Sequence, residues 1–140
     1  AHPNIAAIKD CGGDAAKTAA MLADGRLQVL AGEDLQIFST LAQGGAGAIA
    51  ASAHLHTERF AAVVKLLTLG NLAQARELWS GMPELIEALF AEPNPGPVKA
   101  LLAHQGLMRN ELRRPMMEAR ADSLERLVRL HDGVGPVSHL

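Results

Sequence analysis

Short apolar runs alternate with amphipathic stretches along the first half of the chain. The runs cover residues 5–8, 27–31 and 46–51. Stretches with apolar positions at helical spacing follow them, over residues 14–23, over the segment carrying Leu35, Ile37, Phe38 and Leu41, and over residues 57–69. Strands alternating with helices of about ten residues are typical of βα units on a parallel sheet. The pattern predicts three such units.

Polar and glycine residues mark the ends of these elements. Asp14 can cap the first helix, since its carboxylate can accept bonds from free amide groups of the first turn. Gly25 and Gly70 are expected to stop helices. The pair Gly44-Gly45 permits a tight turn into the third strand.

After Gly70 the pattern becomes helical. Residues 72–90 are predicted to form one long helix, in which Pro83 can introduce a bend because proline lacks a backbone donor. Further expected segments are a rigid non-helical loop over 92–97, a helix over 98–106, a loop over 112–116, a helix over 123–130 and a loose tail from 133. A complete (β/α)8 barrel needs about 250 residues, so three units imply that further units are missing upstream.

Composition and charge narrow the class of protein. The chain has 140 residues, of which 49% are hydrophobic and 3% aromatic, so its core must pack through small aliphatic side chains. The net charge of −2 disfavours nucleic-acid binding, for which a basic excess is expected. Four arginines cluster, but acidic residues lie among them, which predicts a solvated, salt-bridged face. They are Arg109, Arg113, Arg114 and Arg120, with Glu111 and Glu118 between them and Asp122 just after them.

Cysteine content and hydropathy bear on the compartment. A single cysteine, Cys11, excludes an internal disulfide and fits a reducing cytoplasm. No apolar run approaches the ~20 residues of a membrane span, and the N-terminus lacks the layout of a signal peptide. A soluble, cytoplasmic protein that does not interact with membranes is expected.

Four blocks, in order, resemble one family. Residues 8–14 (IKDCGGD) are similar to a Schiff-base lysine motif at a strand end, and residues 31–34 (AGED) to a Gly-acid-acid turn. Residues 44–50 (GGAGAIA) resemble a glycine-rich entry into the last barrel strand, and residues 92–99 (EPNPGPVK) a proline-rich loop between C-terminal helices. The family is that of dihydrodipicolinate synthase and N-acetylneuraminate lyase, the Schiff-base class I aldolases.

The resemblance implies an α/β fold, the C-terminal part of a (β/α)8 TIM barrel. Residues 1–70 would supply barrel strands six to eight, and residues 71–140 a C-terminal helical region. Members are commonly tetramers, so a homo-oligomer is expected. The absent upstream half would carry a catalytic tyrosine, a threonine-containing loop and an arginine. This chain contains no tyrosine, so it cannot supply the proton relay and is expected to be inactive alone.

Lys9 is the catalytic residue that the resemblance implies. A lysine at the C-terminal end of a barrel strand faces the side where such enzymes work. Burial beside Ile5, Ile8 and the alanine-rich third strand is expected to lower the pKa of Lys9 and free its amine. The amine would then form an imine with pyruvate, without any other cofactor. Without its context, Lys9 would be interpreted as an ordinary surface lysine.

Four further residues are candidate substrate contacts. Gly32 would let the backbone approach the substrate, although it could be a plain turn glycine. Glu33 and Asp34 could contact a second substrate. For Asp34, a role in capping the next helix is slightly favoured. Ile49 matches a family position whose main-chain carbonyl lies near the lysine.

Two histidines and the cysteine are interpreted without a chemical role. His54 and His56 follow the third strand, but a metal site would need further ligands, so they are expected to line a loop. Cys11 is expected to be a small packing residue at a strand end. No metal is predicted.

The predicted function is a Schiff-base lyase or synthase, with dihydrodipicolinate synthase-like condensation of pyruvate and an aldehyde, aspartate semialdehyde, favoured. A neuraminate lyase or another 2-keto acid aldolase stays open, because the residues that discriminate second substrates lie mostly upstream. An alternative of another class is a catalytically inert half-barrel that serves as an assembly module. Its exposed edges would require self-association or a complementary N-terminal half.

Overall fold

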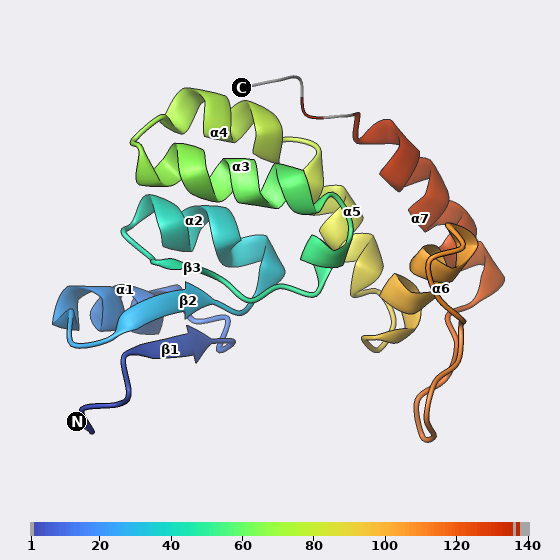
Figure 1. The fold of residues 1–140 in the computed structure, drawn as a ribbon, viewed down its shortest axis with the longest axis horizontal. Coiled ribbons are helices and arrows are strands. Elements are labelled where there is room, and N and C mark those ends of the chain that lie inside the picture. The colour runs from blue at the N-terminus through green and yellow to red at the C-terminus, as the bar shows by residue number, and fades with distance from the viewer. Residues whose placement is uncertain (1, 136, 138–140) are drawn as a thin grey trace.

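The computed structural model describes residues 2–135 and 137 and shows an α/β fold (Figure 1). Its strands are β1 (Ala7–Asp10), β2 (Gln28–Ala31) and β3 (Gly47–Ala48). Its α-helices are α1 (Ala15–Asp24), α2 (Ile37–Ala42), α3 (Thr57–Thr68), α4 (Leu72–Trp79), α5 (Met82–Leu89), α6 (Gly96–His104) and α7 (Ala121–Gly133). Two short 3₁₀ helices, η1 (Asp34–Gln36) and η2 (Ser52–His54), precede α2 and α3.

The three strands form one parallel sheet in the order β1-β2-β3. Lys9 pairs with Leu30, and Leu30 pairs with Gly47. A helix follows each strand, so the three predicted βα units are confirmed. Because β2 lies in the middle, β1 and β3 are the two edges of the sheet in this chain.

The predicted helix boundaries of the first unit are confirmed. The Asp14 carboxylate accepts bonds from the backbone amides of Ala16 (2.9 Å) and Lys17 (3.1 Å) and so caps α1. Gly25 ends this helix in the left-handed conformation, with φ of 66°. Such a conformation is disfavoured for residues with a Cβ, which explains a glycine here.

The expected single helix over residues 72–90 is wrong. The chain instead forms α4 and α5, separated at Ser80 and Gly81. Pro83 lies in the first turn of α5, where its missing N–H costs little, and its ring would clash with the carbonyl of Trp79 in a continuous helix. Proline therefore starts the second helix rather than bending one long helix.

Two other boundaries also differ from the prediction. The loop expected over 92–97 ends earlier, because α6 begins at Gly96 with Pro97 in its first turn. The last helix runs from Ala121 to Gly133 and is longer than the 123–130 expected. The tail predicted to be loose from residue 133 lies partly outside the described residues.

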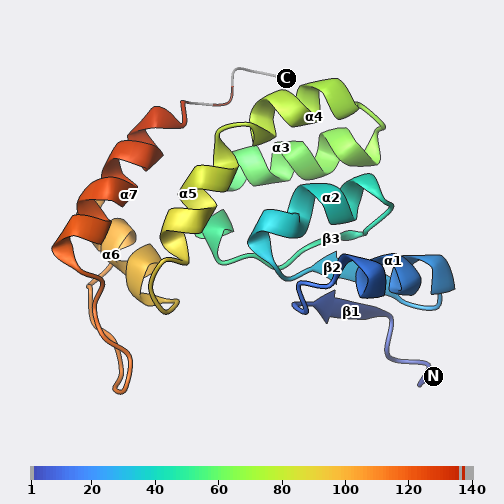
Figure 2. The same cartoon turned by 180° about the vertical axis from the view of Figure 1, so that it is seen from behind.

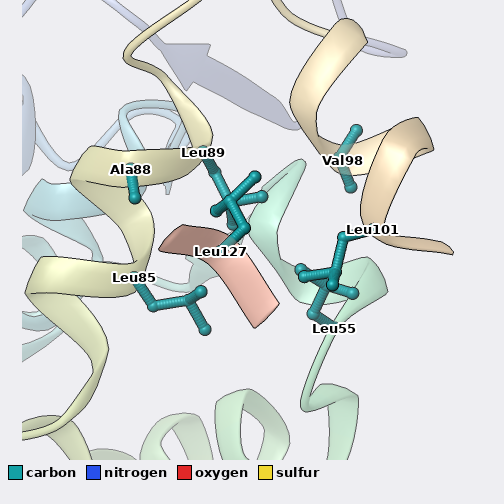
Figure 3. Packing of buried hydrophobic residues seen from close by; sticks show 7 residues of the cluster. All are labelled: Leu55, Leu85, Ala88, Leu89, Val98, Leu101 and Leu127. Atoms are coloured by element: carbon teal, nitrogen blue, oxygen red, sulfur yellow. The ribbon is translucent and has the colours of Figure 1, made fainter. Parts of the chain in front are cut away.

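Two clusters of buried side chains form the core, and α5 contributes to both. One joins β2, α2, α3 and α5 through Ala31, Ile37, Leu41, Phe60, Met82 and Ile86. The other joins α5, α6 and α7 to the segment after η2 (Figure 3) through Leu55, Leu85, Ala88, Leu89, Val98, Leu101 and Leu127. The C-terminal helices therefore pack directly on the βα units through opposite sides of α5.

Helices α2, α3 and α4 form successive layers on one face of the sheet, and α6 and α7 lie beyond the carboxyl ends of its strands. Helix α2 packs on α3, and α3 packs on α4. In both Figure 1 and Figure 2, α6 and α7 lie on the side toward which the β1 arrow points. The carboxyl ends of the strands thus face the C-terminal helices. Within the described residues, no helix is long and apolar enough to cross a membrane.

Candidate active site

The strand register places Lys9, Gly32 and Ile49 on one face of the sheet. Side chains alternate between the two faces along each strand, and paired residues of neighbouring parallel strands share a face. Lys9 pairs with Leu30, and Gly32 lies two residues beyond Leu30. The amide of Ile49 donates to Ala31 (2.9 Å), which continues the pairing past β3. Three predicted site residues therefore meet on one face at the carboxyl ends of the strands.

The opposite face packs against helices. It carries Asp10, Val29 and Ala31, which are all buried. Ile8 belongs to this face because it is one residue from Lys9. The expected contribution of Ile5 and Ile8 to the burial of Lys9 is therefore wrong, because Ile8 points to the other face and Ile5 is 57% exposed. Lys9 itself is exposed in this chain.

Lys9 lies against the backbone of Gly32. A Cβ placed on Gly32 would be only 2.7 Å from Cε and 2.8 Å from Cγ of Lys9, and closer still to Sγ of Cys11. The Lys9 side chain thus runs across the end of β2. The close approach predicted at Gly32 is made by the lysine side chain, while Cys11 is exposed beside it.

Asp10 anchors the turn after Lys9, and the sequence interpretation missed it. Its carboxylate accepts a hydrogen bond from Thr18 Oγ1 (2.6 Å) and forms an ion pair with Lys17 Nζ (2.7 Å). It also accepts from the amide of Gly12 (3.2 Å). The hydrogen bond from Lys17, followed by that from Thr18, holds the pKa of Asp10 below its usual value. The signal was present, since strand alternation places the neighbour of Lys9 under the first turn of the helix.

Asp34 lies elsewhere than either interpretation predicted. Its side chain is buried, and Oδ2 accepts a hydrogen bond from the amide of Ser52 (2.7 Å). Glu33, not Asp34, is the N-cap residue of η1, and its side chain makes no capping bond. Asp34 therefore joins the loops after β2 and β3, and it is too buried to face a second substrate. Glu33 is exposed at the end of β2.

The two histidines after β3 differ in environment. His54 is exposed, whereas the ring of His56 stacks on His131 of α7 with centroids 4.4 Å apart. Burial, with His131 and Arg59 nearby, lowers the pKa of His56. Among residues 2–135 and 137, no group of three or more His, Cys, Asp or Glu is arranged to hold a metal ion.

The arginine-rich segment before α7 carries the predicted ion pairs at two positions. Arg109 lies 3.7 Å from Glu111, and Arg120 lies 3.2 Å from Asp122, all on exposed side chains. The amide of Arg120 also donates to Glu92 (3.3 Å), which ties the proline-rich loop to the start of α7. This segment is therefore part of the helical region's surface and not of the Lys9 face.

An open cavity of about 470 Å³ adjoins the edge strand β1. It lies between the helix-covered face of the sheet and α1, away from the Lys9 face. Ile8, Met21, Leu27 and Val29 supply its apolar lining. Ile8 is 39% exposed at this edge, so an apolar part of the sheet is left open in this chain.

These observations define an α/β protein with a parallel sheet and a lysine at the carboxyl end of an edge strand. Residues 1–132 match the Dihydrodipicolinate synthetase family, and the chain belongs to this family.

Curated relatives support the assignment. The chain is 37% identical over 127 residues to 4-hydroxy-tetrahydrodipicolinate synthase 2 of Clostridium acetobutylicum, covering 89% of this chain and 44% of that protein. It is 36% identical to 4-hydroxy-tetrahydrodipicolinate synthase of Limosilactobacillus fermentum, covering 90% of this chain and 41% of the relative. The chain thus spans less than half the length of these relatives.

Solved structures show the same fold. Dihydrodipicolinate synthase from Acinetobacter baumannii complexed with pyruvate has a TM-score of 0.90 at 28% identity, over 96% of this chain and 47% of that one. N-acetylneuraminate lyase from Fusobacterium nucleatum complexed with pyruvate has a TM-score of 0.81 at 20% identity, over 95% and 46%, which supports the fold alone. The three βα units therefore share the architecture of TIM-barrel enzymes.

Proposed function

We propose that this chain contributes the imine-forming lysine, Lys9, to a pyruvate-dependent synthase of the dihydrodipicolinate synthase type. The observation that carries the proposal is the position of Lys9 on the open face of the sheet, at its carboxyl end, beside Gly32 and Ile49. Active sites of TIM barrels lie at this end of the strands. A relative with the same fold is described as complexed with pyruvate.

Comparison of the lysines singles out Lys9. The chain has four of them: Lys9, Lys17, Lys65 and Lys99. Lys17 is ion-paired with Asp10, and Lys99 donates to the carbonyl of Glu111. Lys65 is on α3, which packs outside α2. Lys9 is the lysine with an exposed side chain on the face of the sheet that no described helix covers, where a small keto acid can reach it.

The chemistry follows from the amine. The unprotonated amine of Lys9 attacks the ketone carbon of pyruvate, and the resulting carbinolamine loses water to give an imine. The imine nitrogen takes up a proton and then withdraws electrons, so the methyl group loses a proton and a neutral enamine forms. The enamine carbon then attacks the carbonyl carbon of an aldehyde, aspartate semialdehyde, and the aldehyde oxygen takes up a proton. Hydrolysis of the new imine releases the product and regenerates Lys9.

The other predicted site residues are assigned by position. Gly32, Glu33 and Ile49 lie at the ends of β2 and β3, beside the face that carries Lys9. We assign Gly32 and the main chain of Ile49 to the pyruvate side of the site and exposed Glu33 to its rim. Asp34 does not contact substrate in this proposal; its buried carboxylate holds the loop after β3 by accepting from the amide of Ser52. The reaction requires no metal or other cofactor in this proposal.

Upstream barrel units of a longer protein are proposed to complete the site. We propose that β1, β2 and β3 are barrel strands six, seven and eight, that residues 1–70 and 71–140 are its last barrel units and helical region, and that the rest of the barrel covers the edge at Ile8. The chain spans 41–47% of the relatives and structures compared, and it contains no tyrosine for proton transfer. The assembled protein is proposed to be a cytoplasmic homo-oligomer.

Trapping of the imine tests the proposal. The complete natural protein is incubated with pyruvate and borohydride, and its intact mass is measured. We expect one stable pyruvate adduct, which Lys9→Ala abolishes and Lys65→Ala leaves in place. An adduct that persists in Lys9→Ala would contradict the proposal. No adduct on the complete protein would favour the inert assembly module.

A second measurement tests the proposed covering half. The 140-residue chain is examined by light scattering alone and after mixing with the upstream part of the natural protein. Self-association alone, replaced by a defined complex with the upstream part, is expected because an apolar sheet edge is exposed. A chain that is monomeric alone and does not bind the upstream part would contradict this assignment.

A further inference from the structure

We propose that Gly32 is a positioning residue for Lys9: the absence of a side chain at residue 32 is what allows the lysine stem to lie across the end of β2. This inference rests on the proposed imine chemistry at Lys9 and adds a residue that acts through the lysine. The sequence interpretation had assigned the free space at Gly32 to the substrate instead.

The space above Gly32 is filled by two side chains of the neighbouring segment. A Cβ built on Gly32 would lie 2.7 Å from Lys9 Cε, 2.8 Å from Lys9 Cγ and closer still to Cys11 Sγ. Real Cβ atoms essentially never have neighbours under 3.0 Å. The Lys9 stem therefore occupies, at two points along its length, the place of an ordinary side chain at residue 32.

The sheet explains why the lysine crosses this position. Lys9 is paired in register with Leu30, which lies two residues before Gly32 on the same face. The amide of Gly32 donates to the carbonyl of Asp10 (2.8 Å), so the pairing of the two segments continues past the strands and brings Gly32 beside Cys11. The backbone at Gly32 is thereby fixed, and only the side chains of Lys9 and Cys11 can yield.

Backbone conformation does not require glycine at this position. The φ of Gly32 lies outside the left-handed region, unlike that of Gly25 or Gly44. Alanine can adopt such a backbone conformation without strain. Close approach of Lys9 and Cys11 is thus the reason for glycine that the structure provides.

An added methyl group at residue 32 is expected to lower the reaction rate at Lys9 more than the stability of the fold. Lys9 and Cys11 are both exposed, so their side chains can turn away from a methyl group at residue 32 with little loss of packing. Relief at Cγ, close to the backbone, requires a change at the first side-chain torsion of Lys9, and such a change moves the amine by several bond lengths. Misplacement of a reacting group by about 1 Å can cost about 100-fold in rate.

The test compares variants of the complete natural protein. The rate of pyruvate trapping by borohydride is measured as a function of pyruvate concentration, together with the thermal unfolding midpoint. Gly32→Ala is expected to lower the maximal trapping rate about 100-fold while the unfolding midpoint stays close to that of the parent. Gly47→Ala is the matched control, since its Cβ would lie 3.2 Å from Leu30 Cδ2 and meets no atom of Lys9. It is expected to trap pyruvate within about twofold of the parent rate.

Two further variants separate the contributions of Lys9 and Cys11. The double variant Cys11→Ala with Gly32→Ala is expected to remain slow, because the clash with the Lys9 stem persists. Should Gly32→Ala lower the unfolding midpoint, Lys9→Ala added to the Cys11→Ala, Gly32→Ala double variant is expected to restore it, because both clashing side chains are then removed. Parental trapping by Gly32→Ala, recovery of trapping upon removal of the Cys11 thiol, or no restoration of the midpoint by the added Lys9→Ala would each overturn the inference.

Failure of the proposed function gives a different result. If the parent forms no adduct at Lys9, the proposed imine chemistry is wrong, whatever the Gly32→Ala variant does. If the parent forms the adduct and Gly32→Ala forms it equally fast, only the positioning role is wrong.

Discussion

Helices α5 and α1 are both amphipathic and similar in length, yet they bury very different shares of their residues. In α5, five of eight residues are buried: Met82, Leu85, Ile86, Ala88 and Leu89. In α1, all ten residues are described and only Thr18 is buried. Thr18 is polar and binds Asp10. Helix α5 thus lies in a well-packed core, whereas α1, in the unit that carries Lys9, buries one polar residue and leaves apolar surface open.

The difference shows that this chain is not structurally uniform. Its C-terminal helices bury their apolar side chains against one another, while β1 and α1 leave Ile8 and the adjoining cavity uncovered. A domain normally buries the apolar face of each element against another. The candidate active site therefore lies at the least complete edge of the chain, which agrees with the proposal that it is shared with upstream barrel units.

The largest expected effect on stability is in the core shared by α5, α6 and α7. Leu127 of α7 is fully buried among leucines of α5 and α6 (Figure 3). Leu127→Ala should destabilise the complete protein by about 2–5 kcal/mol, because it leaves a cavity. Leu107→Ala, at a residue that is 70% exposed, should cost less than about 0.5 kcal/mol in the same urea unfolding experiment. Equal costs would contradict the assignment of this core.

Ile8 tests the open edge directly. It is 39% exposed in this chain, so Ile8→Ala would cost little if the edge faced water in the complete protein. If upstream units cover the edge, the same change should cost about 2 kcal/mol or more. Urea unfolding of the complete protein distinguishes the two. A cost below about 0.5 kcal/mol would refute the covering half.

Asp10 should make the first unit sensitive to acid. Its pKa is lowered in the folded protein, chiefly by the hydrogen bond from Lys17, so its stabilising contribution is present above the unfolded value of 3.8. That contribution is lost as the pH falls through the lower folded value. Asp10→Asn should reduce the dependence of the unfolding midpoint on pH in this acidic window. An unchanged slope would show that the Asp10 cluster does not stabilise the turn after Lys9.

His56 should give a smaller effect near neutral pH. Its pKa is lowered from 6.5 by burial and by nearby His131 and Arg59, so the unfolded chain binds the proton more readily. Stability should fall as the pH decreases from about 7.5 to about 5.5. His56→Asn tolerates the positive φ of 48° and should flatten this dependence. A slope identical to that of the parent would exclude His56 as its source.

Local signals were sufficient to predict the βα units and their limits. Asp14, Gly25 and Gly70 mark helix ends because capping and left-handed geometry depend on residues next to the boundary. The break before α5 was missed because the consequence of Pro83 depends on whether a helix continues through Trp79. Such a choice is settled by packing of Met82 and Ile86 in the core.

The site was predicted in part. Lys9, Gly32 and Ile49 do come together, because parallel strands align their carboxyl ends. The role of Asp34 was missed because its carboxylate accepts from Ser52 of the next loop, and no local pattern encodes a bond over 18 residues. The role of Asp10 was missed although strand alternation indicates it. The prediction that Ile8 buries Lys9 is wrong, because strand alternation turns neighbours in sequence to opposite faces of the sheet.

The most direct test of the account is to locate the pyruvate adduct by peptide mapping. After borohydride reduction, the complete natural protein is digested and each peptide containing Lys9, Lys17, Lys65 or Lys99 is examined by mass spectrometry. We expect the adduct on the peptide with Lys9 and unmodified lysines at the other three positions. An adduct on any other lysine, with Lys9 unmodified, would contradict the central claim.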